Sequence, residues 1–212
     1  MKHMKKTGLY HFAQVVAPLF FKLFYRYKVI GAENIPKDGS VVICSNHTAY
    51  KDPVFMALIQ KRQVWFMAKK ELYKNKFMSF LITKLGAFPV ERSGGISAIR
   101  RGIDILKRGG IVGIFIEGTR SKTGELLRPK PGAMLLAYET DATVVPACII
   151  GTDGKPPKIF RRTVIRIGKP VSVKELGMED ASGTAMRKAS RVVMEQISEL
   201  KDETVREYAK TA

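Results

Sequence analysis

Short apolar runs alternate with segments of helical periodicity along most of this chain. The apolar runs are rich in β-branched and aromatic residues and end at turn-forming residues, which is typical of strands. They predict strands at 40–45, 63–68, 87–90, 111–118, 143–151 and 163–171. Apolar positions spaced for one helical face predict helices at 53–61, 71–86, 97–108 and 132–139, and from 184 onward.

Strands that alternate with helices predict an α/β fold: one domain with a mixed, mostly parallel sheet flanked by helices. Functional groups of such sheets usually gather in the loops beyond the strand ends. At the helix 53–61, Asp52 is predicted to be the N-cap and Pro53 the first helical residue. Gly86 is predicted to end the helix 71–86.

Residues 1–27 differ from the rest, because a basic start is followed by an apolar stretch. Polar residues interrupt this stretch, and it is too short for the roughly 20 apolar residues that span a bilayer. We interpret residues 1–27 as an amphipathic segment on a membrane surface, formed by two short helices broken near Pro18. The alternative is an ordinary helix that packs on the core. The domain itself is then residues 28–212.

The charge balance points to an anionic partner. Lys and Arg number 37 against 19 Asp and Glu, which gives a net charge of +18. Nucleic acid, an anionic membrane and a phosphate-bearing substrate would all fit. No nucleic-acid partner is expected, because stacking motifs, zinc-ligand spacing and helix-turn-helix patterns are absent from the sequence. Cys44 and Cys148 lie in apolar strands and are predicted to be buried free thiols of a cytosolic protein, with no metal site.

Candidate chemistry follows the strand at 40–45, where His47 and Asp52 are separated by four residues. A carboxylate can hold an imidazole in one tautomer and stabilise its protonated form, which makes such a pair suited to general base catalysis. Residues five apart on one helix lie about 140° apart, so contact requires a turn between strand and helix. The alternative is that Asp52 only caps the helix and His47 is a loop residue.

Cations follow two other predicted strands. Glu117 lies at the end of the strand 111–118 and Arg120 follows it three positions later, and the strand 87–90 leads into Arg92. Arginine is suited to bidentate phosphate binding, so these positions are candidates for an anion site. Taken singly, they could equally be a solvated basic loop and a surface arginine.

Four segments together resemble a known family. NHTAYKD at 46–52, GAFPVER at 86–92, EGTRS at 117–121 and VVPACIIG at 144–151 occur in this order. They resemble the four sequence blocks of the glycerolipid acyltransferases, in the form of the bacterial 1-acylglycerol-3-phosphate acyltransferases. The first and third blocks match fully, and the second and fourth match more loosely. The resemblance runs from about residue 28 to 170 and makes residues 28–212 the acyltransferase domain.

The resemblance implies an enzyme that passes an acyl group from acyl-CoA or an acyl carrier protein to lysophosphatidic acid, without a cofactor. His47 would be the general base and Asp52 its orienting partner. The substrate-binding residues would be Arg92, Glu117, Gly118, Thr119, Arg120 and, on a looser match, Lys130. Glycerol 3-phosphate or another lysophospholipid is the alternative acceptor. The enzyme would bind an anionic phospholipid membrane on its cytoplasmic face, as a peripheral or monotopic protein.

Overall fold

The computed structural model describes residues 8–90 and 96–210 and contains a seven-stranded sheet. Its strand order is β1-β7-β6-β2-β5-β3-β4. The strands are β1 (Lys28–Ile30), β2 (Val41–Ser45), β3 (Val64–Lys69), β4 (Ala87–Val90), β5 (Ile111–Phe115), β6 (Thr143–Gly151) and β7 (Thr163–Ile167). Neighbouring strands are parallel except for the antiparallel pair β6 and β7. The predicted fold class is therefore confirmed.

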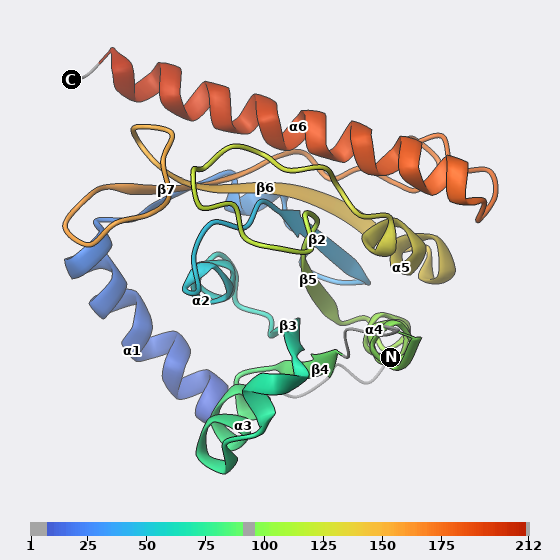
Figure 1. Cartoon of the computed structure of the whole chain (residues 1–212), viewed down its shortest axis with the longest axis horizontal. Helices are drawn as coiled ribbons and strands as arrows, with labels where there is room; N and C mark the ends of the chain where they lie inside the picture. The colour runs from blue at the N-terminus through green and yellow to red at the C-terminus, as the bar shows by residue number, and fades with distance from the viewer. Residues whose placement is uncertain (1–7, 91–95, 211–212) are drawn as a thin grey trace.

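Helices cover both faces of the sheet (Figure 1). They are α1 (Gly8–Tyr25), α2 (Asp52–Leu58), α3 (Lys76–Lys84), α4 (Ile96–Lys107), α5 (Gly132–Thr140) and α6 (Gly183–Ala209), with short 3₁₀ helices η1 (Ala32–Asn34) and η2 (Lys70–Tyr73). Helices α4, α5 and α6 pack on one face, whereas α1 and α2 pack on the other. This arrangement leaves the two ends of the strands as the places where loops gather.

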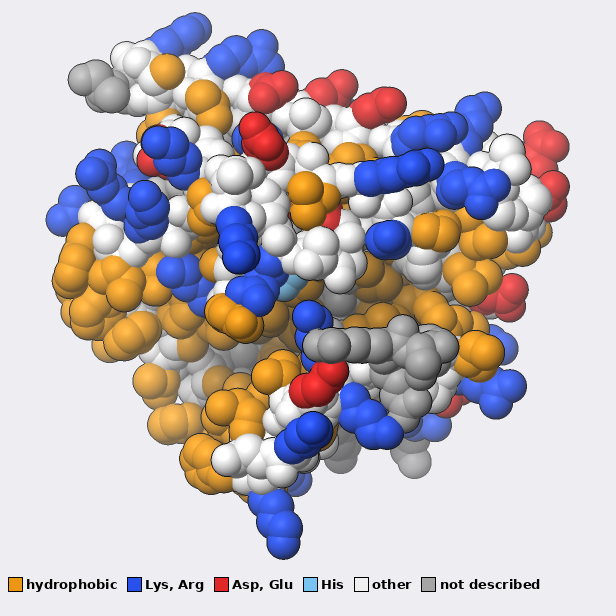
Figure 2. All heavy atoms as spheres, in the orientation of Figure 1, with side chains coloured by type: hydrophobic (Ala, Val, Ile, Leu, Met, Phe, Trp, Pro, Cys, Tyr) orange, Lys and Arg blue, Asp and Glu red, His pale blue; other side chains and the backbone are white. Residues whose placement is uncertain are grey.

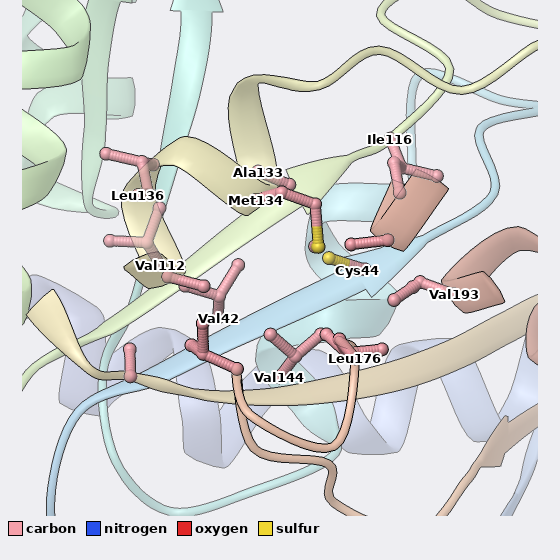
Figure 3. Close-up of a cluster of buried hydrophobic side chains, with 14 of the residues drawn as sticks. Val42, Cys44, Val112, Ile116, Ala133, Met134, Leu136, Val144, Leu176 and Val193 are labelled. Carbon is pink, nitrogen blue, oxygen red and sulfur yellow. The ribbon is translucent and has the colours of Figure 1, made fainter. Parts of the chain in front are cut away.

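The central strands are buried on both faces, and their side chains alternate between two core layers. In β2, Val42 and Cys44 belong to the layer under α4, α5 and α6, whereas Val41 and Ile43 belong to the layer under α1 and α2. Figure 3 shows part of the first layer, where side chains of β2 and β5 meet those of α5 and α6. The apolar strands thus form the centre of the core, and all residues of β2 are buried up to its carboxyl end.

Both cysteines are free and fully buried, as predicted. Burial raises the pKa of the Cys44 thiol to about 12, and that of Cys148 to about 12 as well. A thiol that stays protonated at neutral pH is a poor nucleophile. Cys44 lies three residues before His47 but therefore belongs to the core.

The predicted break at Pro18 is wrong, because α1 is one continuous helix across it. Proline removes one backbone hydrogen bond, but packing on both sides of this position holds the helix. The Gln14 amide donates to Gln60 O at 3.0 Å, and the rings of Phe21 and Tyr25 pack against Phe55 of α2. In the part of the chain described, no helix is long and apolar enough to cross a membrane.

Several predicted boundaries also differ from the structure, and the strand expected at 163–171 ends at Ile167. The expected helix 71–86 is divided into η2 and α3, because the side chain of Asn75 accepts a hydrogen bond from Met78 N at 3.0 Å and starts a new helix. The expected strand 111–118 ends at Phe115, and the following residues turn away from the sheet. Helix 53–61 ends at Leu58. The three-residue strand β1 was not predicted.

Candidate active site

Two strand ends meet in the site. Strands β2 and β5 are parallel neighbours, with Ser45 paired to Phe115, so their carboxyl ends lie together. His47 N donates to Glu117 Oε1 at 2.8 Å, and Ser121 N donates to His47 O at 2.8 Å. The structure therefore brings together the first and third sequence segments, which lie about 70 residues apart in the chain.

His47 and Asp52 are in direct contact. The distance from His47 Nδ1 to Asp52 Oδ2 is 2.9 Å, and the carboxylate is fully buried. The same oxygen accepts hydrogen bonds from Thr48 N at 2.6 Å and Ala49 N at 2.7 Å. The turn required by the spacing is present, and it leaves Nε2 of His47 as the nitrogen that a substrate could use. The assignment of this pair to catalysis stays a prediction.

The predicted N-cap role of Asp52 is wrong. Lys51 is the N-cap of α2, and Asp52 is the first helical residue. Its carboxylate turns back to the amides of Thr48 and Ala49 because these point into the turn that precedes the helix. The other oxygen, Oδ1, is buried and has no hydrogen-bond partner among residues 8–90 and 96–210. Oδ2 therefore makes the contacts with His47, Thr48 and Ala49, whereas Oδ1 makes none among the described residues.

An aromatic ring supports the imidazole. The rings of His47 and Phe115 are stacked, with centroids 4.0 Å apart and planes 17° apart. Phe66 of β3 lies beyond Phe115, with centroids 6.4 Å apart. Gly113 makes room for this arrangement, because a Cβ there would lie 2.5 Å from Phe66 Cε1. Sequence reasoning missed Phe115, because the sequence does not show that β5 lies beside β2 in the sheet.

Asn46 fixes the other side of the strand end. Its side chain is buried, donates to Ile149 O at 3.0 Å and accepts from Ile149 N at 2.8 Å. The amide thus continues the pairing of β2 with β6 by one residue beyond the strand. It holds the residue before His47, a role that sequence reasoning did not assign.

Glu117 connects the two loops of the site. It is 1% exposed, and burial raises the pKa of its carboxyl group. Oε1 accepts from His47 N, and Oε2 accepts from Leu127 N at 2.9 Å. Both oxygens are thus bonded to backbone amides, which positions His47 against the loop that carries Arg120. The sequence had placed Glu117 with the substrate-binding residues, and that role stays a prediction.

The remaining candidates lie on the exposed side of the site. The Arg120 guanidinium lies 3.5 Å from the ring centroid of Tyr50, which is 80% exposed. Gly118 has φ +69°, a left-handed conformation that glycine adopts easily, and the side chain of Lys130 lies beside it. Thr119 is exposed between them. Arg92 lies outside the described residues, so its predicted role is not addressed.

No group of three or more His, Cys, Asp or Glu side chains in the described ranges could hold a metal ion.

The sequence profile of the Acyltransferase family matches residues 26–150, which is more than half of the chain and includes nearly all of the four segments. This chain belongs to the acyltransferase family. It is therefore an enzyme of the acyltransferase class.

Individual members of the acyltransferase family agree with this assignment. The chain is 36% identical over 168 residues to the 1-acyl-sn-glycerol-3-phosphate acyltransferase of Bacillus subtilis, covering 77% of this chain and 82% of that protein. It is 31% identical over 149 residues to the enzyme of that name from Streptococcus pneumoniae, covering 68% and 55%. The crystal structure of the 1-acyl-sn-glycerophosphate (LPA) acyltransferase PlsC from Thermotoga maritima matches with a TM-score of 0.72 and 30% identity, covering 91% and 79%.

Proposed function

We propose that this acyltransferase transfers a fatty acyl group from an acyl thioester to the sn-2 hydroxyl of 1-acylglycerol-3-phosphate, with His47 as general base. The observation that carries the proposal is the contact of His47 Nδ1 with the buried carboxylate of Asp52, because it leaves Nε2 open beside the loop of Arg120. The names of the relatives support this acceptor over glycerol 3-phosphate. The product is phosphatidic acid, a precursor of membrane phospholipids.

In this mechanism Nε2 of His47 takes the proton of the acceptor hydroxyl as the hydroxyl oxygen bonds to the thioester carbonyl carbon. The tetrahedral intermediate then collapses, the C–S bond breaks with its electron pair going to sulfur, and His47 returns the proton to the departing thiolate. Asp52 keeps the proton on Nδ1 in the resting state and stabilises the imidazolium. Proton transfer of this kind contributes about 10²–10⁴-fold to rates. No cofactor is needed.

The phosphate of the acceptor is assigned to Arg120 and Arg92, with Lys130, Thr119 and the backbone of Gly118 nearby. Support comes from Arg120, which is held beside His47 through the Ser121 N to His47 O hydrogen bond. A guanidinium offers several donors in one plane and suits a phosphate. The acyl donor is proposed to be acyl-CoA or an acyl carrier protein, since a basic protein attracts either one.

We also propose that α1 lies on the anionic cytoplasmic face of the cell membrane. The long helix α6 buries apolar residues and exposes charged ones such as Arg187, Glu195 and Glu199. Helix α1 instead exposes large apolar side chains: Phe12, Val15, Val16, Leu19, Phe20 and Leu23. Such a face, in a chain of net charge +18, is suited to an interface with anionic lipids.

The link between α1 and the site supports a membrane-bound substrate. Lys51, next to Asp52, donates to Tyr25 OH at 3.1 Å at the end of α1. Tyr25 in turn packs on Phe55 of α2, the helix that starts with Asp52. A lipid entering from the surface under α1 would therefore meet the site close by.

The test is thiol release from acyl-CoA, and in parallel from acylated carrier protein, with lysophosphatidic acid in detergent micelles. Thiol should appear only when this acceptor is present, and His47→Ala should lower kcat by about 10²–10⁴-fold. His11→Ala is the matched control, because His11 is exposed on α1 and should leave kcat unchanged. Full activity of His47→Ala would disprove the general base role. Turnover with glycerol 3-phosphate alone would move the acceptor to that compound.

A further inference from the structure

The loop between β6 and β7, residues 152–162, lies at the same edge of the sheet as His47. Strand β6 runs parallel to β2, so its carboxyl end at Gly151 lies at the edge where β2 ends. Because β7 returns antiparallel from Thr163, the whole loop stands at that edge. Strand β1 is parallel to β7, so the end of α1 that precedes it also lies there. Three segments of distant sequence thus share one edge (Figure 1).

The tip of this loop exposes two large apolar side chains. Ile159 is 54% exposed and Phe160 is 66% exposed. Phe160 also has φ +60°, a left-handed conformation that bulky residues rarely adopt. Asparagine or glycine adopts this backbone conformation more easily, and at an exposed position a polar side chain is more favourable than a phenyl ring. Neither the backbone conformation nor the exposure of this side chain in the folded monomer therefore explains a phenyl ring at this position.

The tip continues the apolar face of α1. Phe160 N donates to Phe24 O at 2.6 Å, and the rings of Phe160 and Phe24 are 5.8 Å apart. Phe20, which is exposed on α1, contacts Phe24 with ring centroids 4.4 Å apart and planes 38° apart. A surface that accepted Phe20 would therefore meet Phe160 as well.

Positive charge surrounds the tip. The loop 152–162 carries four basic residues and one acidic residue, a net charge of +3. Lys158, Arg161 and Arg162 are exposed, as are Lys22 and Arg26 at the end of α1. Figure 2 shows Lys and Arg side chains directly beside the apolar side chains at the edge where α1 and this loop lie. Apolar tips ringed by cations suit the boundary between acyl chains and anionic headgroups.

We propose that the loop 152–162 is a second docking segment for an anionic bilayer. Ile159 and Phe160 enter the headgroup boundary beside α1, and Lys158 and Arg161 bind lipid phosphates. The inference rests on the proposed function, in which α1 lies on the membrane. Two contacts at the edge that carries His47 fix the orientation of the enzyme, so that its site faces the lipid surface.

The test is co-sedimentation with vesicles of equal parts phosphatidylglycerol and phosphatidylcholine. The double variant Ile159→Ser with Phe160→Asn should bind about tenfold more weakly, since two large apolar side chains no longer leave water. Its Tm should be unchanged or higher, because asparagine tolerates the positive φ. Ile96→Ser is the matched control, because Ile96 is 68% exposed at the start of α4, and α4 packs on the face of the sheet opposite α1. This control should bind like the native protein.

A second pair of variants tests the charges independently. Lys158→Gln with Arg161→Gln should weaken vesicle binding, whereas Lys107→Gln with Arg108→Gln, at the opposite edge of the sheet, should weaken it less. Unchanged vesicle binding of both loop variants would overturn the proposal. Failure of the native protein to co-sediment with the vesicles would overturn it as well. A native dimer that the loop variant converts to monomer would assign the tip to a second copy. Acyl transfer in detergent should be unchanged in the loop variants, so failure of the proposed function would appear separately, in the native protein.

Discussion

The two strand ends that form the site are held in different ways. At the end of β2, the backbone N, the backbone O and the ring of His47 each have a partner: Glu117, Ser121, and Asp52 with Phe115. Beyond the end of β5, the guanidinium of Arg120 lies over a tyrosine that is itself largely exposed. The first is a rigid arrangement around two buried carboxylates, with His47 partly exposed, and the second is open to solvent.

This difference matches the tasks proposed for the two ends. Proton transfer requires a base held within a fraction of an ångström, and fixed hydrogen bonds provide that. Binding a lipid phosphate at a membrane surface requires a cation that can adjust to a headgroup. Changes at the β2 end should therefore lower kcat, and changes beyond β5 should raise KM.

The largest effect is expected from Asp52→Asn. The asparagine oxygen can keep the hydrogen bonds that Asp52 Oδ2 accepts, while its amide group takes the buried position of Oδ1. The variant therefore changes charge more than geometry, and the imidazolium loses its counter-charge. We expect kcat to fall by about 10³-fold with little change in KM. Steady-state kinetics in detergent, with circular dichroism to check the fold, would measure this, and a retained kcat would show that Asp52 is structural only.

Glu117→Gln should affect both ends of the site, because Glu117 joins them. Glutamine can accept only one of the two backbone hydrogen bonds, and its NH₂ group would face the other donor. An unsatisfied buried amide costs about 1–3 kcal/mol, so the free energy of unfolding should fall by that amount. We expect a drop in kcat of about 10-fold to 100-fold as His47 shifts. Denaturant unfolding and kinetics measure the two effects, and a variant with native stability would contradict the role of Glu117 as a connection.

The same carboxyl group predicts a pH dependence. Burial raises the pKa of Glu117 in the fold, so the folded state binds its proton more tightly than the unfolded chain does. The stability that this proton contributes is fully present below the unfolded pKa, near 4.3, and is lost as pH rises through the raised folded pKa. The free energy of unfolding of the native protein should therefore fall with pH relative to that of Glu117→Gln. If the curves of unfolding free energy against pH were parallel for the native protein and Glu117→Gln, the Glu117 carboxyl group would not be the cause of the pH dependence.

Arg120→Lys tests the open end of the site. Lysine keeps the charge but loses the planar donors that bind two phosphate oxygens. We expect KM for lysophosphatidic acid to rise by about tenfold while kcat stays close to native. Tyr50→Leu is a matched control that removes the ring under the guanidinium and keeps the arginine. A fall in kcat without a change in KM for Arg120→Lys would place this residue with the chemistry instead.

The sequence predicted those features that depend on neighbours in the chain. Apolar periodicity located most strands and helices, and the spacing of His47 and Asp52 allowed the contact that the structure shows, although only the family resemblance favoured it over the alternative. The helix start was misassigned because an aspartate before a proline suits an N-cap and also suits a turn. The break at Pro18 was wrong because contacts of α1 with α2, which are distant in sequence, hold the helix.

The features that were missed depend on the strand order. Asn46 pairs with Ile149 because β2 lies between β5 and β6 in the sheet, and no spacing along the chain reveals that order. The two amides that donate to Glu117 lie 70 and 10 residues away in the sequence, so these hydrogen bonds were not predicted, and the substrate-binding role of Glu117 stays a prediction. Polar residues at strand ends could thus be located from the sequence, but their partners could not.

The smallest effect is expected from Phe115→Leu, and it tests whether stacking adds to the rigidity of the β2 end. Leucine keeps an apolar contact but removes the flat face that lies 4.0 Å from the His47 ring. A stacked pair contributes about 0.5–1.5 kcal/mol beyond area burial, which corresponds to a fall in kcat of a few-fold to about tenfold. Phe115→Tyr keeps the ring and should restore native kcat, whereas loss of packing alone would lower Tm in the leucine variant and leave kcat unchanged. A fall in kcat for leucine that tyrosine reverses, at constant KM, would show that Phe115 positions the base, and that the rigid end of the site depends on its aromatic support as well as on its hydrogen bonds.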